Sequence, residues 1–274
     1  MPDRYAVIGN PVAHSRSPAI HAAFAEGTGE DIVYDRVESP LTGFADTARR
    51  FFADGGRGLN VTVPFKEQAF ALVDVRDELA IEAGAVNTIR SEGGRLQGFN
   101  TDGLGLVCDL TRNIGRLLAG KRILLLGAGG AGRGVVGPLL RQKPEVLCIV
   151  NRTIERAQVL VAEFNQRAGN PIRALRWNSF RRIEGPWDIV INATSAGLRD
   201  EPLPLPHTVF GKPSVAYEMV YGRETQFMRF ARERGATIVS DGLGMLVEQA
   251  AESFQIWRGK RPRTEKVIEQ LRAG

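Results

Sequence analysis

The sequence contains few cysteines and histidines. Its two cysteines, Cys108 and Cys148, lie in apolar stretches without metal-ligand spacing. We therefore expect buried free thiols, which fit a reducing compartment, in preference to a disulfide or a ligand pair. The three histidines form no metal-ligand cluster, and no Ser-His-Asp order is evident. We predict that the protein has no metal site.

Long apolar runs are also absent. No apolar stretch approaches the roughly 18 residues that span a bilayer, and residues 1–11 lack a basic segment followed by a long apolar one. We therefore expect a cytoplasmic protein without a membrane partner. The net charge is only +5, and the basic residues are dispersed, so no nucleic-acid partner is predicted. A mild positive excess favours anionic small molecules. Monomer and homodimer both stay open.

The composition is that of a globular protein, with 43% hydrophobic and 24% charged residues. A chain of 274 residues suits two domains and buries a sizeable core. Strand and helix patterns alternate, which predicts an α/β fold. In the first part, we expect strands at residues 4–9, 31–37, 58–63, 85–90 and 95–100, and helices at 17–24, 43–53 and 103–118.

The pattern restarts after a break at residues 119–120. The continuous apolar run 121–127 is typical of a parallel strand buried on both faces. Further strands are expected at 146–150, near 172–175, and at 188–194, 214–220 and 236–240. A helix is expected at 153–168, and a last helical region begins near residue 240.

A glycine-rich turn follows the strand at 121–127. Gly127, Gly129 and Gly132 match G-x-G-x-x-G directly between a strand and a helix. In this pattern the first glycine permits a tight turn, the second lets the backbone approach a pyrophosphate, and the third allows close helix–strand packing. The helix N-terminus adds free N–H groups. The sequence thus predicts a dinucleotide site, the alternative being a tight turn without a ligand.

The next strand ends in a basic segment instead of an acidic one. A carboxylate for the adenosine ribose is expected about 20 residues beyond the glycines, yet this position holds Asn151, Arg152 and Thr153, with Arg156 one turn later. Arginines attract a 2′-phosphate, whereas a carboxylate repels it. The segment therefore predicts NADP in preference to NAD. The alternative is that both arginines are ordinary surface residues at a helix start.

Polar residues gather near expected strand ends in the first hundred residues. Open α/β sheets bind ligands at strand ends, so these side chains are substrate-site candidates. They are Ser15 and Ser17 in GNPVAHSRSP; Asn60, Thr62 and Lys66 in NVTVPFK; Asn87 in GAVNT; and Asn100 and Asp102 in GFNTDG.

With these four motifs, the sequence resembles the shikimate dehydrogenase family. The resemblance continues through GAGGAGR, NRT-x-x-RA, INATSAG (191–197) and DGLGMLVEQA (241–250), in order along nearly the whole chain. It implies reduction of 3-dehydroshikimate to shikimate with NADPH. It also implies an α/β fold with a substrate-binding catalytic domain at 1–103, a Rossmann-type doubly wound NADP domain at 104–239, and C-terminal helices at 240–274 that return to the first domain.

The resemblance also implies roles for individual residues. For the substrate these are Ser15, Ser17 and Tyr221 at the carboxylate, Thr62, Asn87, Asp102 and Gln249 at ring hydroxyls, and Lys66 with Asp102 as the catalytic pair. For the cofactor they are Gly127, Ala128, Gly129, Gly130 and Ala131 at the pyrophosphate; Asn151, Arg152, Thr153 and Arg156 at the 2′-phosphate; and Thr194, Ser195, Met219 and Gly242 towards the nicotinamide.

The implied catalytic pair suits carbonyl reduction. Lys66 can donate a proton as ammonium and accept one as amine, with Asp102 orienting it. Desolvation favours the amine and the neighbouring carboxylate favours the ammonium, and the sequence leaves this balance open. One departure stands at 218–227, where EMVYGRETQF replaces the family's Asp-x-x-Tyr-Asn-Pro-x-x-Thr. The alternatives are a quinate/shikimate dehydrogenase of broader specificity and a non-catalytic NADP-binding sensor.

Overall fold

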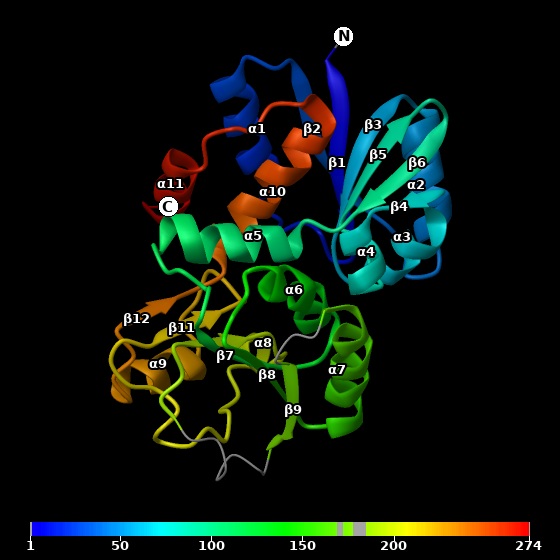
Figure 1. The fold of residues 1–274 in the computed structure, drawn as a ribbon. Coiled ribbons are helices and arrows are strands. Elements are labelled where there is room, and N and C mark those ends of the chain that lie inside the picture. Colours follow the sequence, from blue (N-terminus) through cyan, green and yellow to red (C-terminus); the bar gives the residue numbers. More distant parts are fainter. Residues whose placement is uncertain (1, 169–171, 178–184, 274) are drawn as a thin grey trace. The chain divides into compact units, whose positions relative to one another are not determined.

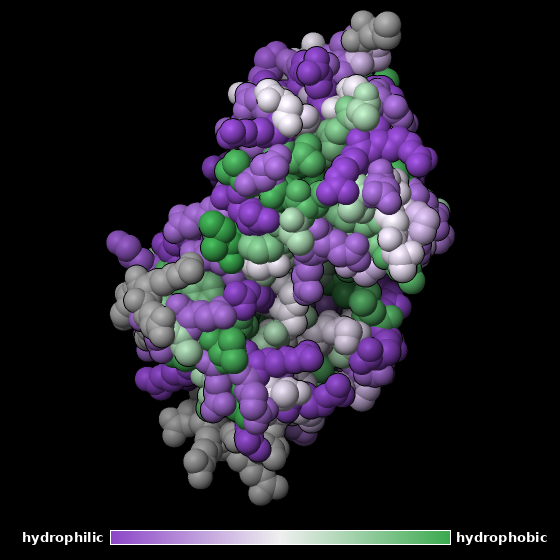
Figure 2. Space-filling model, turned by 90° about the vertical axis from the view of Figure 1, so that its right-hand side faces the viewer, coloured by the Kyte–Doolittle hydropathy of each residue, from purple (hydrophilic) through white to green (hydrophobic). Residues whose placement is uncertain are grey.

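The computed structural model describes residues 2–168, 172–177 and 185–273. The chain divides into two compact units, Met1–Gly105 with Leu246–Gly274, and Leu106–Met245. Each unit is a sheet with helices packed around it, which confirms the predicted α/β fold (Figure 1). Among the helices of the described residues, none has the length and apolarity of a membrane span. On the face shown in Figure 2, hydrophilic side chains are interspersed with hydrophobic ones.

The first unit is built on a mixed six-stranded sheet in the order β2-β1-β3-β5-β6-β4. Strand β1 pairs in parallel with β2 and β3, whereas β5 is antiparallel to both β3 and β6. The strands are β1 (Asp3–Gly9), β2 (Ile32–Glu38), β3 (Gly56–Val61), β4 (Val75–Arg76), β5 (Thr88–Glu92) and β6 (Arg95–Phe99).

Helices from both ends of the chain complete the first unit. Phe254 of the C-terminal α10 is fully buried in one cluster with Ile20 and Phe24 of α1, so the last helices do pack on the first unit, as predicted. A second cluster holds Phe44 and Phe65 stacked at 5.1 Å. The helices that lie wholly in this unit are α1 (Ser17–Thr28), α2 (Phe44–Ala53), α3 (Lys66–Leu72), α4 (Glu78–Ala83) and α11 (Glu265–Ala273). Helices α5 (Asp102–Cys108) and α10 (Leu243–Arg258) belong to it only in part, with residues 102–105 and 246–258.

The second unit has a six-stranded, all-parallel sheet in the order β12-β11-β10-β7-β8-β9. The chain therefore starts in the middle and winds first to one side and then to the other, which is the doubly wound topology predicted. The elements are β7 (Arg122–Leu126), α6 (Gly130–Arg141), β8 (Val146–Asn151), α7 (Ile154–Ala168), β9 (Ile172–Arg176), β10 (Ile189–Asn192), α8 (Ala196–Arg199), β11 (Val215–Glu218), α9 (Gln226–Glu233) and β12 (Ile238–Ser240).

Strand β7 is buried on both faces, as the unbroken apolar run predicts. Ile123 and Leu125 belong to the cluster beneath α6, and Leu124 and Leu126 to the cluster that includes Phe227 of α9. Because successive strand residues point to opposite faces, β7 has an apolar cluster on each face, as a central strand of a sheet covered on both sides needs. The loops after β7 and β10 then lie at the topological switch point, where such sheets bind ligands.

Three expected element bounds are wrong by three residues or more. The helix expected at 103–118 is α5 followed by a π-helix, Asp109–Asn113, and it stops there because Gly115 adopts a left-handed φ of 71°. The strand expected at 85–90 begins at Thr88, since the N–H groups of Gly84 and Ala85 close α4. Helix α1 continues past residue 24 to Thr28, whose hydroxyl donates to the Phe24 carbonyl.

His21 packs inside the first unit. It is fully buried, its ring stacks on Tyr34 at 4.1 Å, and both ring nitrogens lie without a hydrogen-bond partner among the described residues. Burial lowers the pKa of His21 to about 3. The unfolded chain therefore binds a proton at this residue below about pH 6.5, and the folded chain does so only near pH 3.

We predict that His21→Phe makes the protein less sensitive to acid. As pH falls from 6.5 towards 3, the unfolded wild type gains a proton that the folded protein refuses, so its unfolding free energy decreases. The free energies of wild type and variant should diverge by about 2 kcal/mol between pH 6.5 and 4.5. Urea unfolding at both pH values measures this, and parallel pH dependences would contradict the burial argument.

Candidate active site

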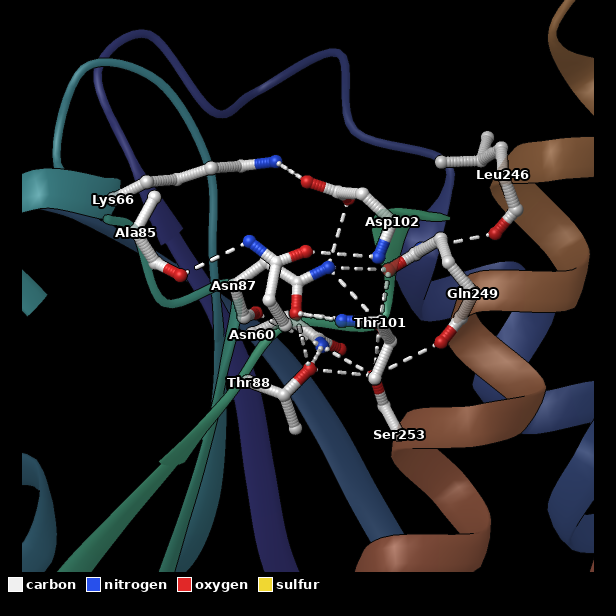
Figure 3. A network of polar contacts seen from close by, with 11 residues as sticks. Asn60, Lys66, Ala85, Asn87, Thr88, Thr101, Asp102, Leu246, Gln249 and Ser253 are labelled. Atoms are coloured by element: carbon white, nitrogen blue, oxygen red, sulfur yellow. Dashed lines mark hydrogen bonds and ion pairs between the residues drawn. The ribbon is translucent and has the colours of Figure 1, made fainter. Parts of the chain in front are cut away.

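Lys66 and Asp102 form an ion pair at the start of two helices. Lys66 opens α3 and Asp102 opens α5, and Lys66 Nζ lies 2.6 Å from Asp102 Oδ2 (Figure 3). Their side chains are 31% and 17% exposed, so a small molecule can reach the pair. The arrangement provides a proton donor and acceptor held by a carboxylate, which is what acid–base catalysis needs.

Asn87 fixes the other oxygen of Asp102. Its Nδ2 donates to Asp102 Oδ1 at 2.8 Å and also approaches Thr101 Oγ1 at 2.9 Å and Gln249 Oε1 at 3.3 Å. Its Oδ1 accepts from the Thr101 N–H and from the Thr88 hydroxyl, both at 2.9 Å. The structure thus joins four predicted residues, Lys66, Asn87, Asp102 and Gln249, in one network (Figure 3).

The sequence marks Asn60 as a substrate-site candidate, but the structure places it in a buried layer beneath this network with Tyr34, Thr88 and Ser253, which the sequence does not single out. Asn60 Nδ2 donates to Thr88 Oγ1 and to Ser253 Oγ of α10, and the Tyr34 hydroxyl donates to Asn60 Oδ1 at 2.7 Å. Asn60 is only 6% exposed. An asparagine inside an apolar strand was the available signal, because a buried amide needs partners. Through Thr88 and Asn87, this layer is linked to Asp102 of the ion pair.

The two predicted carboxylate-binding serines lie together at the start of α1, where Ser15 precedes the helix and Ser17 is its first residue. Ser15 Oγ donates to Ser17 Oγ at 3.1 Å and accepts from the Ser17 N–H at 3.2 Å. The Ser15 carbonyl is held by Arg36. The Thr62 methyl lies against Gly9. Gln249, in turn, is anchored by its own amide to the Leu246 carbonyl.

The glycine turn after β7 has the shape that a pyrophosphate needs. Gly127 has a φ of 106°, and a side chain on Gly132 would bring its Cβ within 2.2 Å of the Gly127 carbonyl oxygen. By contrast, a Cβ at Gly129 or Gly130 would meet nothing within 4 Å. The first turn of α6 carries no acidic residue. Open backbone N–H groups at a helix start therefore fit an anionic ligand here.

Asn151 ties this turn to the basic segment. Its Oδ1 accepts from the Ala128 N–H at 3.1 Å, and its Nδ2 donates to the Thr153 carbonyl at 2.7 Å. Arg152, Thr153 and Arg156 follow on exposed positions. A hydrogen bond from Arg199 lowers the pKa of Glu201, and the charge of Arg152 contributes to the same shift. The positive charge of Arg152 therefore acts on the loop that contains Glu201.

The remaining predicted cofactor residues follow β10 and β11. Thr194 lies beside the turn, its methyl 3.2 Å from where a Cβ on Gly127 would stand. Met219 pairs its N–H with the Asn192 carbonyl, and Gly242 packs against Met219 so closely that a Cβ would lie 2.2 Å from its carbonyl oxygen. Ser195 is exposed just before α8. The predicted role of each stays a prediction.

The segment 218–227, which differs from the family pattern, has a backbone conformation that suits its glycine. Gly222 has a φ of 80°, a conformation that asparagine tolerates better than most other residues, so glycine suits the position of the family's asparagine. Its N–H donates to Asp241, and Arg223 donates to the Gly197 carbonyl. Tyr221 belongs to the second unit and Ser15 and Ser17 to the first, so their shared role stays a prediction.

The second unit defines the chain as a dinucleotide-binding α/β protein. Comparisons with known proteins agree. Residues 7–89 match the shikimate dehydrogenase substrate binding domain, residues 109–199 the shikimate / quinate 5-dehydrogenase family, and residues 242–272 the shikimate 5′-dehydrogenase C-terminal domain. The chain belongs to the shikimate dehydrogenase family.

Individual relatives resemble the chain over nearly its full length. A shikimate dehydrogenase (NADP(+)) of Alkalilimnicola ehrlichii is 55% identical over 273 residues, covering 99% of each chain. One of Cupriavidus taiwanensis is 54% identical, covering 99% of this chain and 94% of the relative. The structure of the Thermus thermophilus enzyme in complex with NADP(H) and shikimate is 36% identical, with a TM-score of 0.86 and 99% of both chains covered.

Two glycine substitutions should separate folding from binding. Gly132→Ala should destabilise the chain by about 1–3 kcal/mol or more, because its methyl overlaps the Gly127 carbonyl. Gly129→Ala meets open space, so it should fold normally but weaken NADP⁺ binding, since the methyl stands where the ligand would lie. Thermal unfolding and titration calorimetry measure these effects. Equal NADP⁺ affinity in Gly129→Ala and wild type would show that this turn does not hold the ligand.

Arg152→Ala should raise KM for NADP⁺ far more than KM for NAD⁺, because only NADP carries the 2′-phosphate. Removing one charge-assisted contact corresponds to roughly 10–100-fold. Steady-state kinetics with both cofactors provide the measurement. Arg232→Ala, which removes an exposed arginine from α9, is the matched control and should change neither constant. An equal rise for both cofactors would mean that Arg152 does not recognise the phosphate.

Proposed function

We propose that this chain is an NADP-dependent shikimate dehydrogenase, which reversibly reduces 3-dehydroshikimate to shikimate. The observation that carries the proposal is the partly exposed Lys66–Asp102 pair, which Asn87 orients, in a chain whose other unit has an open glycine turn. The printed names of the relatives support it, since they specify NADP and shikimate. A sensor without catalysis would not need this pair.

The nicotinamide supplies the hydride when bound, and the protein's residues do the rest. The pyrophosphate would be held by the turn Gly127–Ala131, and the 2′-phosphate by Asn151, Arg152, Thr153 and Arg156. Thr194, Ser195, Met219 and Gly242 would lie towards the nicotinamide. The open space at Gly129 and the absence of an acidic residue from the first turn of α6 fit these assignments.

Lys66 would act as the proton donor and acceptor. As the carbonyl oxygen of 3-dehydroshikimate gains negative charge, the Lys66 ammonium donates a proton to it, and in the reverse direction the amine takes one from the hydroxyl. Asp102 holds Nζ at 2.6 Å and so aims it. Because Asn87 binds the second Asp102 oxygen, the carboxylate keeps its orientation while the lysine changes its protonation state.

The substrate would be held by residues of complementary chemistry. Hydroxyls of Ser15, Ser17 and Tyr221 suit a carboxylate, and Thr62, Asn87, Asp102 and Gln249 suit ring hydroxyls. The expected cytoplasmic location stays part of the proposal, supported by the two free and buried cysteines.

Quinate is the second candidate substrate, because the family matched by residues 109–199 includes quinate dehydrogenases by its description. Absorbance of reduced nicotinamide distinguishes the candidates when purified protein is given shikimate or quinate, each with NADP⁺ or NAD⁺. The proposal predicts fast turnover with shikimate and NADP⁺ alone. Comparable rates with quinate or NAD⁺ would assign broader specificity, and no turnover by a folded chain that binds NADP⁺ would favour the sensor.

Lys66→Ala should lower kcat by about 10²–10⁴, the usual contribution of a positioned acid–base group. NADP⁺ affinity should stay unchanged, because Lys66 lies in the first unit and the glycine turn in the second. Lys260→Ala removes a lysine of the same unit that pairs with Glu30 and serves as the control. Unchanged kcat in Lys66→Ala would remove this residue from the mechanism.

A further inference from the structure

Glu218 is a fully buried carboxylate at the end of β11 to which the chemistry above gives no role. Asn192 Nδ2 donates to its Oε2 at 2.7 Å, and the Thr225 hydroxyl donates to the same oxygen at 3.0 Å. The Val220 N–H donates to Oε1 at 3.1 Å. Burial raises the pKa of Glu218, and these donors oppose the shift. All three partners donate, as suits a carboxylate, which only accepts.

The carboxylate determines which way the Asn192 amide points. An asparagine side chain has a donating NH2 end and an accepting oxygen, and its neighbours decide the orientation. Because Glu218 only accepts, the NH2 end of Asn192 faces it and Oδ1 faces away. That oxygen accepts from the Thr194 N–H at 3.1 Å and from the Thr194 hydroxyl at 2.7 Å.

Thr194 has no donor left for a ligand, and only its hydroxyl oxygen can still accept a hydrogen bond. Its backbone N–H and its hydroxyl proton both go to Asn192, and its Oγ1 accepts from the Ala196 N–H at 3.3 Å. A ligand that approaches this hydroxyl therefore meets a lone pair. Thr194 borders the glycine turn through Gly127, so the ligand concerned is the one held at that turn.

We propose that Glu218 is a positioning residue for the cofactor: it fixes the Asn192 amide and thereby holds Thr194 as a hydrogen-bond acceptor toward an N–H or O–H group of the bound dinucleotide. This rests on the proposed function in taking NADP as the ligand. It extends that function by stating that Thr194 accepts, and the dinucleotide donates, the hydrogen bond between them.

Glu218 is one methylene longer than the aspartate of the family pattern, and its surroundings leave room for it. A Cβ on Gly197 would stand 2.9 Å from Glu218 Oε1, so only glycine leaves room for this carboxylate. Arg223, one of the residues that depart from the family pattern, donates to the Gly197 carbonyl, and its charge also acts on Glu218. Glu218 and Arg223, which both depart from the family pattern, thus both lie against Gly197, a glycine of the INATSAG motif.

The test is a double-mutant cycle on NADP⁺ affinity, measured by titration calorimetry. Thr194→Val removes the acceptor and should raise Kd about tenfold, the effect of one neutral hydrogen bond. Glu218→Gln replaces one accepting oxygen by an NH2 group, which cannot accept a hydrogen bond. Either Asn192 then turns its amide, or the hydrogen bond from the Val220 N–H is lost. This variant should raise Kd by several-fold. Because Glu218 acts through Thr194, the double variant should bind no more weakly than Thr194→Val alone.

Asp188→Asn is the matched control, since Asp188 precedes the same strand, β10, at its opposite end and receives the Arg122 N–H there. Its Kd should equal that of wild type. Thermal unfolding checks that each variant is folded. If Glu218→Gln does not fold, Asn192→Ala replaces it in the cycle, and the same lack of additivity is expected.

An unchanged Kd in Glu218→Gln, or fold-changes that multiply in the double variant, would overturn the proposal. The cycle needs no catalysis, so its outcome is separate from that of the proposed function. A chain that shows the expected coupling but does not oxidise shikimate would support the role of Glu218 and contradict the dehydrogenase assignment.

Discussion

A buried asparagine whose NH2 end is held by a carboxylate occurs at the candidate site of both units. Asn87 donates to Asp102 and accepts from the N–H and hydroxyl of Thr101. Asn192 donates to Glu218 and accepts from the same two groups of Thr194. In each case the carboxylate removes the freedom of the amide to turn, and the amide fixes a threonine. The orientation of Asp102 in the first unit and of Thr194 in the second depends on this constraint.

The fold places each of these asparagines beside or at one end of a strand. Asn87 precedes β5 and Asn192 ends β10, so a backbone already fixed by the sheet carries each amide. Burial makes the arrangement rigid, because an amide that loses a partner away from water costs free energy. Some groups proposed to contact ligands are accessible, such as the partly exposed Lys66 and the exposed turn at Gly129 and Gly130. Pre-oriented groups at the edge of a rigid sheet are what efficient catalysis needs.

Much of the fold could be predicted from sequence because its signals are local. The apolar run at 121–127 and the glycines after it predict a central parallel strand and its turn, and both are present. Lys66 and Asp102 lie in motifs, but only the fold shows that 36 residues of separation bring them to 2.6 Å. The roles of Asn192 and Glu218 could not be predicted, since each resembles an ordinary strand residue until its partners are known. The helix end at Asn113 was also missed, because its cause is one left-handed glycine backbone.

Direct transfer of hydrogen from substrate to cofactor is the central claim. It is measured most directly with shikimate that carries deuterium on the carbon of the hydroxyl to be oxidised, followed by mass spectrometry of the cofactor. The account predicts one deuterium in each molecule of NADPH formed by the wild-type chain. NADP⁺ that is not reduced, or NADPH that carries no deuterium, would contradict it.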